Sequence, residues 1–366
     1  MKIGGRHYQT IWLAEDGWSV EIIDQTRLPH ALETRRLSTL EDAARAIRTM
    51  QVRGAPLIGV TAAYGLCLAL RDDASNEGMH LAVEHLASQR PTAVNLRWAL
   101  EEMQAAVRNL PRDARVEAAY KRATRMARED VAINRAIGEN GLDLLKGLLV
   151  QKKPGARLNV LTHCNAGWLA TVDWGTATAP IYHAHDLGLP IQVWVDETRP
   201  RNQGAALTAF ELGGHGVPHT IIADNAGGHL MQRGEVDIVI VGADRVAANG
   251  DAANKIGTYL KALAARDTGV PFYVAMPYST IDWSLDNGMN ISIEERSADE
   301  VLHMTGRTAA GDIATVQVAP HGSPAANPAF DITPARLITG LITERGICPA
   351  TGDGLLGLFE EQRAAE

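Results

Sequence analysis

The stretch LNVLTHCNAG, residues 158–167, decides the fold of this chain. A largely apolar run from Leu158 to Leu161 leads directly into a small, polar turn that contains glycine, which is typical of a strand buried on both faces of a parallel sheet. Comparable runs, with helical segments between them, lie at residues 191–195, 220–223, 238–241 and 272–276. Strands that alternate with helices predict an α/β fold with an open, Rossmann-like parallel sheet flanked by helices.

Upstream of this sheet the sequence has a mostly helical pattern. A short strand or hairpin is expected at residues 17–24, where apolar and polar residues alternate. Helices are expected from a capping box at residues 38–41 to Met50, over residues 54–70, from Pro91 to about Leu110, and from about Arg115 to Leu149. The N-terminal part is therefore predicted to be a mostly helical domain with a small β element.

The length of 366 residues suggests two domains, because a single hydrophobic core rarely grows so large. The sequence Lys152-Lys153-Pro154-Gly155 breaks the helical pattern. We therefore expect residues 1–150 to form the helical domain and residues 151–366 the Rossmann-like α/β domain. The same four residues would also suit a simple surface turn.

Composition limits the classes of function. Hydrophobic residues make up 46% of the chain and charged residues 21%, as in ordinary globular proteins, and the formal net charge is -8. The electrostatic field of a protein with this negative charge repels nucleic acid and anionic lipid. An anionic ligand must therefore be attracted by a local cluster of cationic groups. The first residues lack the apolar core of a signal peptide, and no apolar run is long enough to span a bilayer. We expect a cytoplasmic protein without nucleic-acid or membrane partners.

The site is expected at one edge of the predicted sheet, because ligands of open α/β sheets bind outside the carboxyl ends of the strands. Four successive predicted strands end in segments rich in polar or reactive side chains. These segments are residues 162–167, 196–204, 224–228 and 242–245. Their convergence on one edge is more informative than any single residue.

Two residues in these segments are candidates for catalysis. Asp244 follows the apolar run 238–241, and a carboxyl group near apolar walls can have a raised pKa and act as a general acid. An aspartate at a strand end also commonly caps a turn. Cys164 precedes a turn whose backbone donors can lower the pKa of a thiol, yet a free cysteine is often a small buried apolar residue. Position alone leaves both alternatives open.

Other kinds of site are disfavoured. Cys67, Cys164 and Cys348 are widely spaced and form no CxxC pair, which argues against a disulfide framework or a thiolate zinc site. His215 and His219 have the spacing of helical metal ligands, but glycines and a proline interrupt that stretch, so no metal is expected. The phosphate-loop, dinucleotide-binding and serine-hydrolase motifs are absent, which weakens those interpretations.

Three segments suit an anionic ligand. Arg53-Gly54-Ala55-Pro56 combines a guanidinium group with the N–H groups of an expected helix start. Arg90 precedes another expected helix, and Asn254-Lys255 offers an amide and an ammonium group. Each is weak evidence alone, because surface Arg and Lys side chains are usually only solvated charges. Together they predict a site for a small phosphorylated molecule.

These segments resemble the methylthioribose-1-phosphate isomerase family, which shares a superfamily with ribose-1,5-bisphosphate isomerases and with regulatory subunits of a translation initiation-factor exchange complex. The resemblance extends over nearly the whole chain. It is carried by residues 53–59, 90–96, 162–167, 197–204, 242–245, 254–258 and 327–331, in the same order as in the family.

The resemblance implies a helical N-terminal domain, a Rossmann-like C-terminal domain, a homodimer and an isomerase of methionine salvage that needs no cofactor. By resemblance, the catalytic residues are Cys164 and Asp244. The substrate-binding residues that it implies are Arg53, Gly54, Ala55, Arg90, Gln203, Asn254 and Lys255. The alternatives are an isomerase of 5-deoxyribose 1-phosphate or ribose 1,5-bisphosphate, and a non-catalytic regulatory subunit.

Overall fold

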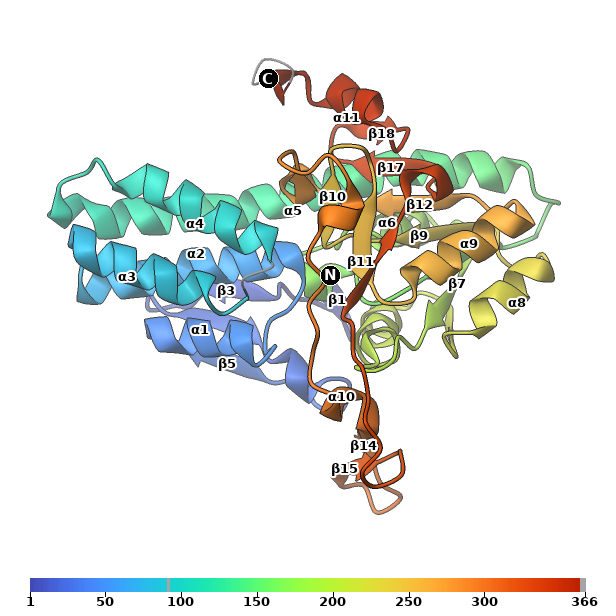
Figure 1. Ribbon diagram of the computed structural model, residues 1–366, viewed down its shortest axis with the longest axis horizontal. Helices are drawn as coiled ribbons and strands as arrows, with labels where there is room; N and C mark the ends of the chain where they lie inside the picture. The colour runs from blue at the N-terminus through green and yellow to red at the C-terminus, as the bar shows by residue number, and fades with distance from the viewer. Residues whose placement is uncertain (91–92, 363–366) are drawn as a thin grey trace.

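The computed structural model describes residues 1–90 and 93–362 (Figure 1). The chain opens with two small β elements. The first is a ribbon of β1 (Lys2–Ile3) and β2 (Arg6–His7), and the second is an antiparallel sheet of β3 (Ile11–Leu13), β4 (Val20–Ile23) and β5 (Thr34–Leu37). The strand expected at residues 17–24 is the central strand of the second sheet.

A helical region follows, as predicted. Its helices are α1 (Leu40–Arg48), α2 (Ala55–Asp72), α3 (Asn76–Ala87), α4 (Val94–Val107) and α5 (Arg112–Val150). Figure 1 shows α1 to α4 grouped on one side of the molecule, whereas α5 continues across to the other side. Pro91, which was expected in the first turn of α4, lies outside the described residues.

The start of α1 differs by one residue from the expected capping box. Thr39 is the N-cap, and its hydroxyl accepts a hydrogen bond from the N–H of Asp42, while the Asp42 carboxylate accepts one from the N–H of Thr39. Glu41, the partner expected from the sequence, instead pairs with Arg48 and His85. An aspartate two positions inside the helix therefore replaces the expected glutamate.

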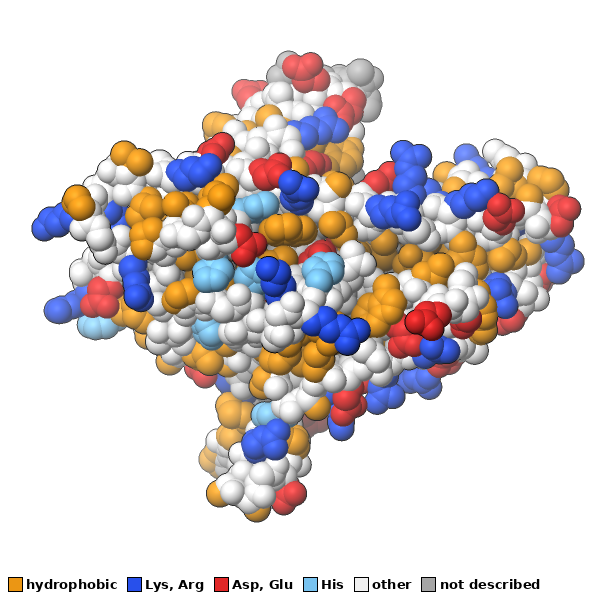
Figure 2. All heavy atoms as spheres, turned by 180° about the vertical axis from the view of Figure 1, so that it is seen from behind, with side chains coloured by type: hydrophobic (Ala, Val, Ile, Leu, Met, Phe, Trp, Pro, Cys, Tyr) orange, Lys and Arg blue, Asp and Glu red, His pale blue; other side chains and the backbone are white. Residues whose placement is uncertain are grey.

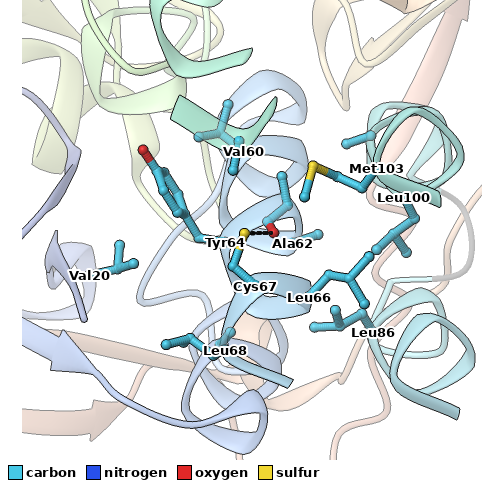
Figure 3. Packing of buried hydrophobic residues seen from close by; sticks show 14 of the residues in the cluster. Val20, Val60, Ala62, Tyr64, Leu66, Cys67, Leu68, Leu86, Leu100 and Met103 are labelled. Carbon is cyan, nitrogen blue, oxygen red and sulfur yellow. Dashed lines mark hydrogen bonds between the residues drawn. The ribbon is translucent and has the colours of Figure 1, made fainter. Parts of the chain in front are cut away.

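Helix α2 is the centre of the first hydrophobic core. Fourteen of its 18 residues are buried, and Figure 3 shows its side chains packed against strand and helix neighbours. Gly59 and Gly65 permit this packing, since a Cβ atom there would lie 2.9 Å from Asn95 O and Ala43 Cβ, respectively. Cys67 is buried in this core, and burial raises the pKa of its thiol, so it is a packing residue.

The second half contains a seven-stranded sheet in the order β18-β17-β12-β9-β6-β7-β8, in which all neighbours except β17 and β18 are parallel. Its strands are β6 (Leu158–Thr162), β7 (Ile191–Asp196), β8 (His219–Ile222), β9 (Ile238–Val241), β12 (Phe272–Ala275), β17 (Gly340–Thr343) and β18 (Gly346–Cys348). The five predicted strands are confirmed to within one residue at each end. The order of the first six along the chain, 3-2-1-4-5-6, is that of doubly wound sheets.

Helices cover this sheet, and smaller elements extend from it. The helices are α6 (Ala179–Asp186), α7 (Ala209–His215), α8 (Ala226–Gln232), α9 (Thr258–Thr268) and α11 (Gly352–Leu358). A second, four-stranded sheet joins β13 (Ile281–Asp282), β10 (Arg245–Ala247), β11 (Ala252–Lys255) and β16 (Phe330–Thr333). After α10 (Asp299–Leu302), the hairpin of β14 (His303–Arg307) and β15 (Ile313–Gln317) stands away from the body, as Figures 1 and 2 show.

The expected boundary between residues 150 and 151 lies between α5 and β6. The turn there separates the helical region from the parallel sheet, but Ile137, Leu142 and Leu145 of α5 belong to the same hydrophobic cluster as Leu158 and Val160 of β6. The division into two domains therefore stays a prediction.

None of the helices in the described part of the chain combines the length and the apolar character that crossing a membrane requires.

Candidate active site

Cys164 and Asp244 lie just beyond the ends of β6 and β9. These two strands are hydrogen-bonded neighbours, with Val160 opposite Ile238. They are also the first and fourth strands of the sheet, so the strand order reverses between them, and ligands of open α/β sheets bind at such a point. The topology therefore brings together two side chains that are 80 residues apart in sequence.

Both residues line one small cavity of about 70 Å³. Eight of the nine residues that were predicted for the site contribute to its wall. They are Arg53, Gly54, Ala55, Arg90, Cys164, Gln203, Asp244 and Lys255. A larger cavity of about 870 Å³ adjoins it, because Met50, Arg53 and Gln203 line both.

Asn254 is not brought to the cavity. It lies on β11 between Ala253 and Lys255, which both line the wall. Side chains of a strand alternate between its faces, so the residue between two wall residues points away from them. Its buried amide donates a hydrogen bond to the Thr258 hydroxyl at 3.0 Å. The structure therefore places Asn254 behind the wall, where it anchors the start of α9.

The N-terminus of α2 faces the cavity through Gly54 and Ala55. Gly54 has φ +91°, and a Cβ atom there would lie 2.4 Å from the carbonyl oxygen of Ala170. Only glycine fits this backbone conformation and this close approach. The free N–H groups and positive dipole of the first turn of an 18-residue helix are suited to an anion.

Arg53 is tied to the turn that carries Cys164. Its guanidinium group donates to the side-chain oxygen of Asn165 at 2.5 Å and to the backbone oxygen of the same residue at 2.9 Å. The Asn165 amide in turn donates to Thr208 and Glu211, both at 3.1 Å. Two hydrogen bonds from Arg53 to a single fixed residue orient the plane of the guanidinium group. Its remaining N–H groups are left for a ligand.

Two further cations are buried around the cavity. Lys255 donates to the carbonyl oxygen of Ala329 at 2.8 Å, and its ammonium group lies 4.6 Å from the ring centroid of Phe330. Arg90 lies 3.4 Å from a carboxylate oxygen of Glu294, and its Nε atom is buried without a hydrogen-bond partner. Burial lowers the pKa of both side chains, and the nearby acidic groups oppose that shift.

The two candidate catalytic groups respond to these charges. Burial raises the pKa of the Asp244 carboxyl group, while the charges of Lys255, Arg53 and Arg90 oppose this shift. Burial likewise raises the pKa of the Cys164 thiol, and Arg53 and Lys255 again act in the opposite direction. A carboxyl group that can hold a proton thus lies in the same cavity as a thiol whose ionisation is favoured by cations.

The backbone around Cys164 is held in a rarely populated conformation. Cys164 has φ +65°, its N–H donates to the Thr198 hydroxyl at 2.8 Å, and its carbonyl accepts from Thr208 at 2.7 Å. Non-glycine residues with positive φ are uncommon and cluster at functional sites.

Gln203 precedes a π-helical turn, and its side-chain oxygen is buried without a partner, which suits a ligand hydroxyl group.

Sequence reasoning missed part of the wall and two residues, Asn165 and Glu294, that contact its arginines. Asn165 lies in a segment that was singled out, but its hydrogen bonds with Arg53 could not be seen in the sequence, because the two residues are 112 positions apart. Glu294, which pairs with Arg90, and part of the apolar wall lie in segments without a distinctive pattern. The apolar members are Met50, Ile58, Ala93, Ala253, Ile291, Ile293 and Phe330. Ile58, Ala93 and Phe330 fall within segments that carry the family resemblance, but nothing in the sequence marked these side chains as part of the wall, because only the folded chain brings them to one cavity.

A cluster of possible metal ligands lies behind the cavity. Ligand atoms of His163, Asp196 and Asp224 lie within 4.8 Å of one another. Lys261 already provides a positive charge there, since its ammonium nitrogen is 3.2 Å from Asp196 Oδ2 and donates to the carbonyl oxygen of Asp224. The cluster therefore already has a cation beside its carboxylates and does not require a metal.

Comparison with known proteins places this architecture in a family. Residues 51–350 match the model of the initiation factor 2 subunit family. The chain is 65% identical to the methylthioribose-1-phosphate isomerase of Methylorubrum populi, over the full length of both. Its fold matches the 5-methylthioribose 1-phosphate isomerase of Pyrococcus horikoshii with TM-score 0.84 and 41% identity, over 97% of each chain.

A structure named translation initiation factor eIF-2B, subunit delta, from A. fulgidus, matches with TM-score 0.79 and 38% identity, over 97% of this chain and all of the other. These matches span the helical region, the sheet and the cavity alike. The chain therefore belongs to the initiation factor 2 subunit family and, within it, to the methylthioribose-1-phosphate isomerases.

Proposed function

We propose that this protein is an aldose–ketose isomerase that converts 5-methylthioribose 1-phosphate into 5-methylthioribulose 1-phosphate, as a cytoplasmic homodimer in methionine salvage. The names of relatives at 60–65% identity support the reaction. The observation that carries the proposal is the common cavity of Cys164 and Asp244, which also contains Arg53, Arg90 and Lys255. A proton donor, a group that can act as a base when it is ionised, and a cationic anion site are together suited to isomerisation of a sugar phosphate.

The phosphate on C1 prevents spontaneous opening of the sugar ring, so the enzyme must break the bond between C1 and the ring oxygen. In our proposal Asp244 starts protonated and gives its proton to that oxygen, while the Cys164 thiolate removes the proton from C2. A C1–C2 double bond forms as the C1–O bond breaks. The C2 hydroxyl then returns a proton to Asp244, and C1 takes the proton of Cys164, which yields the ketose.

An alternative route moves hydrogen from C2 to C1 as hydride. Asp244 would still protonate the ring oxygen, and Cys164 would then only influence the charge of the cavity. The two routes differ in solvent exchange. Reaction in D2O places deuterium at C1 by the proton route when the Cys164 proton exchanges with solvent, whereas hydride transfer leaves C1 free of deuterium.

The remaining groups would bind the substrate. Arg53, Arg90, Lys255 and the N-terminus of α2 would hold the phosphate, and Gln203 would bind a sugar hydroxyl group. The apolar side chains of the wall favour a methylthio substituent on C5 over a second phosphate. They discriminate weakly against 5-deoxyribose 1-phosphate, because a missing apolar group costs only about 1–3 kcal/mol of binding. Slower turnover of that sugar is therefore expected.

The test is proton NMR of the purified protein with 5-methylthioribose 1-phosphate, alongside Cys164→Ser and Asp244→Asn. We expect the wild type to form the ketose and each variant to lose roughly 10²–10⁴-fold in rate, as is usual when a general acid or base is removed. Cys348→Ser and Asp143→Asn, which lie outside the cavity wall, should retain activity. A folded wild type that forms no ketose would leave another sugar 1-phosphate or the regulatory role as the alternative.

The homodimer is tested separately from the reaction. Size-exclusion chromatography with light scattering should give twice the chain mass of 39.4 kDa. A mass of one chain at micromolar concentration would refute the homodimer without affecting the isomerase proposal.

A further inference from the structure

His163 lies immediately before Cys164 and has unusual partners. Its ring is almost fully buried, with 1% of the residue exposed. Nδ1 is 2.8 Å from Asp196 Oδ2 at the end of β7, and Nε2 is 2.8 Å from the carbonyl oxygen of Ile256. Both partners are oxygen atoms that accept hydrogen bonds.

The partners determine how many protons the ring carries. A neutral imidazole has a single N–H, so one of its nitrogens would present a lone pair to an oxygen. Asp196 is a carboxylate, because Lys261 Nζ lies 3.2 Å from the same oxygen that contacts His163. A carbonyl oxygen has no proton to give. Both contacts are therefore hydrogen bonds only when His163 is an imidazolium cation.

The surrounding charges accommodate that cation. Asp196 faces it from β7, Asp224 lies 4.0 Å away after β8, Lys261 approaches from α9, and Asp331 lies on β16. Three carboxyl groups therefore surround two cations. Gly257, with φ +102°, makes room for the ring, since a Cβ atom there would lie 3.1 Å from both Cε1 and Nε2 of His163.

The two hydrogen bonds join two parts of the candidate active site. His163 precedes Cys164, and Ile256, whose carbonyl it binds, follows Lys255. His163 itself is not part of the cavity wall. We propose that His163 is a positioning residue that is held as an imidazolium between Asp196 and Ile256, and that it fixes the Cys164 turn relative to Lys255. This inference rests on the proposed function for its effect on turnover, but not for its protonation state.

The position of Lys255 relative to Cys164 matters because the charge of Lys255 favours ionisation of the Cys164 thiol. Without the imidazolium, the segment that carries Lys255 loses its link to the Cys164 turn. The thiolate should then be less stable, and the catalytic groups less well aligned. Misplacement by about 1 Å can cost on the order of 100-fold in rate.

The first test is ¹⁵N NMR of histidine-labelled wild-type protein. Among the described histidines, only His163 has both ring nitrogens within 3 Å of acceptor oxygens. At pH 8 we expect one histidine with two protonated ring nitrogens, and we expect its signals to disappear in His163→Gln. A wild-type spectrum in which every histidine is neutral at pH 8 would overturn the proposal, whether or not the variant folds and whether or not the protein is an isomerase.

The second test separates positioning from a merely structural role. The rate of Cys164 alkylation by iodoacetamide is measured against pH by peptide mass spectrometry in the wild type, His163→Gln and the control His219→Gln. His219 lies on β8, is partly buried and likewise contacts a backbone carbonyl oxygen, that of Val217. We expect the alkylation profile of His163→Gln to move to higher pH and its kcat to fall about 10-fold or more with a smaller change in KM. A folded His163→Gln with wild-type profiles would refute the positioning role.

Discussion

At the scale of single residues, Lys255 sets the balance between the two candidate catalytic groups. The proposed reaction requires a protonated carboxyl group and an ionised thiol in one cavity. Burial disfavours the ionised form of both Asp244 and Cys164, and Lys255 favours it in both. Loss of the Lys255 charge should therefore raise the pKa of both groups.

Replacing Lys255 by Met should shift the acidic limb of kcat/KM to higher pH. Removal of the positive charge raises the pKa of the Cys164 thiol, so the thiolate is lost at a higher pH than in the wild type. Turnover across pH 5 to 10 and the alkylation rate of Cys164 measure the shift. Lys121→Met, which removes an exposed lysine on α5, is the control and should leave both profiles unchanged. An acidic limb that stays in place in Lys255→Met would contradict this assignment of charge.

The sequence could predict where the two candidate catalytic residues lie because the strand ends are marked by short apolar runs, whereas their roles and the set of binding residues came from the family resemblance. Cys164 and Asp244 each lie three residues after the last residue of such a run, and the cavity contains both. Asn254 was selected together with Lys255, although neighbouring residues of a strand face opposite ways. The hold of Asn165 on Arg53 could not be predicted, because it joins two elements whose packing is set by the whole core.

At the scale of elements, the approach of α2 to the Cys164 region depends on one glycine. Gly54 combines a positive φ with a close contact to the backbone of Ala170. The contact brings the N-terminus of a long helix from the first half of the chain to the carboxyl edge of the sheet in the second half. An added methyl group would push these elements apart.

Gly54→Ala should therefore lower both stability and kcat/KM. Strain in the positive φ region costs roughly 1–3 kcal/mol, and the contact at 2.4 Å with a backbone oxygen adds to it. The matched control is Gly17→Ala, which has φ +77° but has no atom within 4 Å of its Cβ position. Urea unfolding and steady-state kinetics measure the difference. Equal effects of the two substitutions would show that the contact with Ala170 has no role.

Helix α7 contains a buried acid that should make stability depend on pH. Burial raises the pKa of Glu211 from 4.5 to about 7, although Leu169 N–H and the Asn165 amide donate to it. The native state therefore binds a proton that the unfolded state releases between about pH 4.5 and 7. This contribution to stability is complete below pH 4.5 and is lost as pH rises towards 7.

Glu211→Gln should weaken this pH dependence. The wild type should lose stability between pH 5 and 8 as Glu211 gives up its proton, whereas the variant has no proton to lose at this position. The free energy of unfolding of the variant minus that of the wild type should therefore increase over this range. Urea denaturation at both pH values measures the change. Glu235→Gln removes an exposed carboxylate and serves as the control, with no such trend expected. A parallel pH dependence in Glu211→Gln and the wild type would exclude Glu211 as its source.

At the scale of the whole molecule, the sequence predicted the order of helices and strands better than their packing. Parallel strands buried on both faces are marked by apolar runs, and all five expected ones are present. β17 and β18 were missed, because only Leu341 and Ile342 of β17 are strongly apolar and β18 follows within three residues. The placement of α5 across both halves was not predictable, since periodicity shows that a helix has an apolar face and not which neighbours cover it.

The packing of α5 leads to a prediction about the expected boundary at residues 150 and 151. Ile137, Leu142 and Leu145 are buried against the sheet, and burial of each such side chain contributes about 2 kcal/mol. Their sum is comparable with the total stability of a domain, which is about 5–15 kcal/mol.

We therefore expect residues 151–366 alone to lack cooperative unfolding and to regain it when residues 1–150 are supplied. Circular dichroism during urea titration of the fragment, of the mixture and of the intact chain measures this. A longer fragment, residues 112–366, retains α5 and should unfold more cooperatively than residues 151–366. If the shorter fragment unfolds as cooperatively as the intact chain, the two parts are independent folding units and the contacts of α5 are secondary.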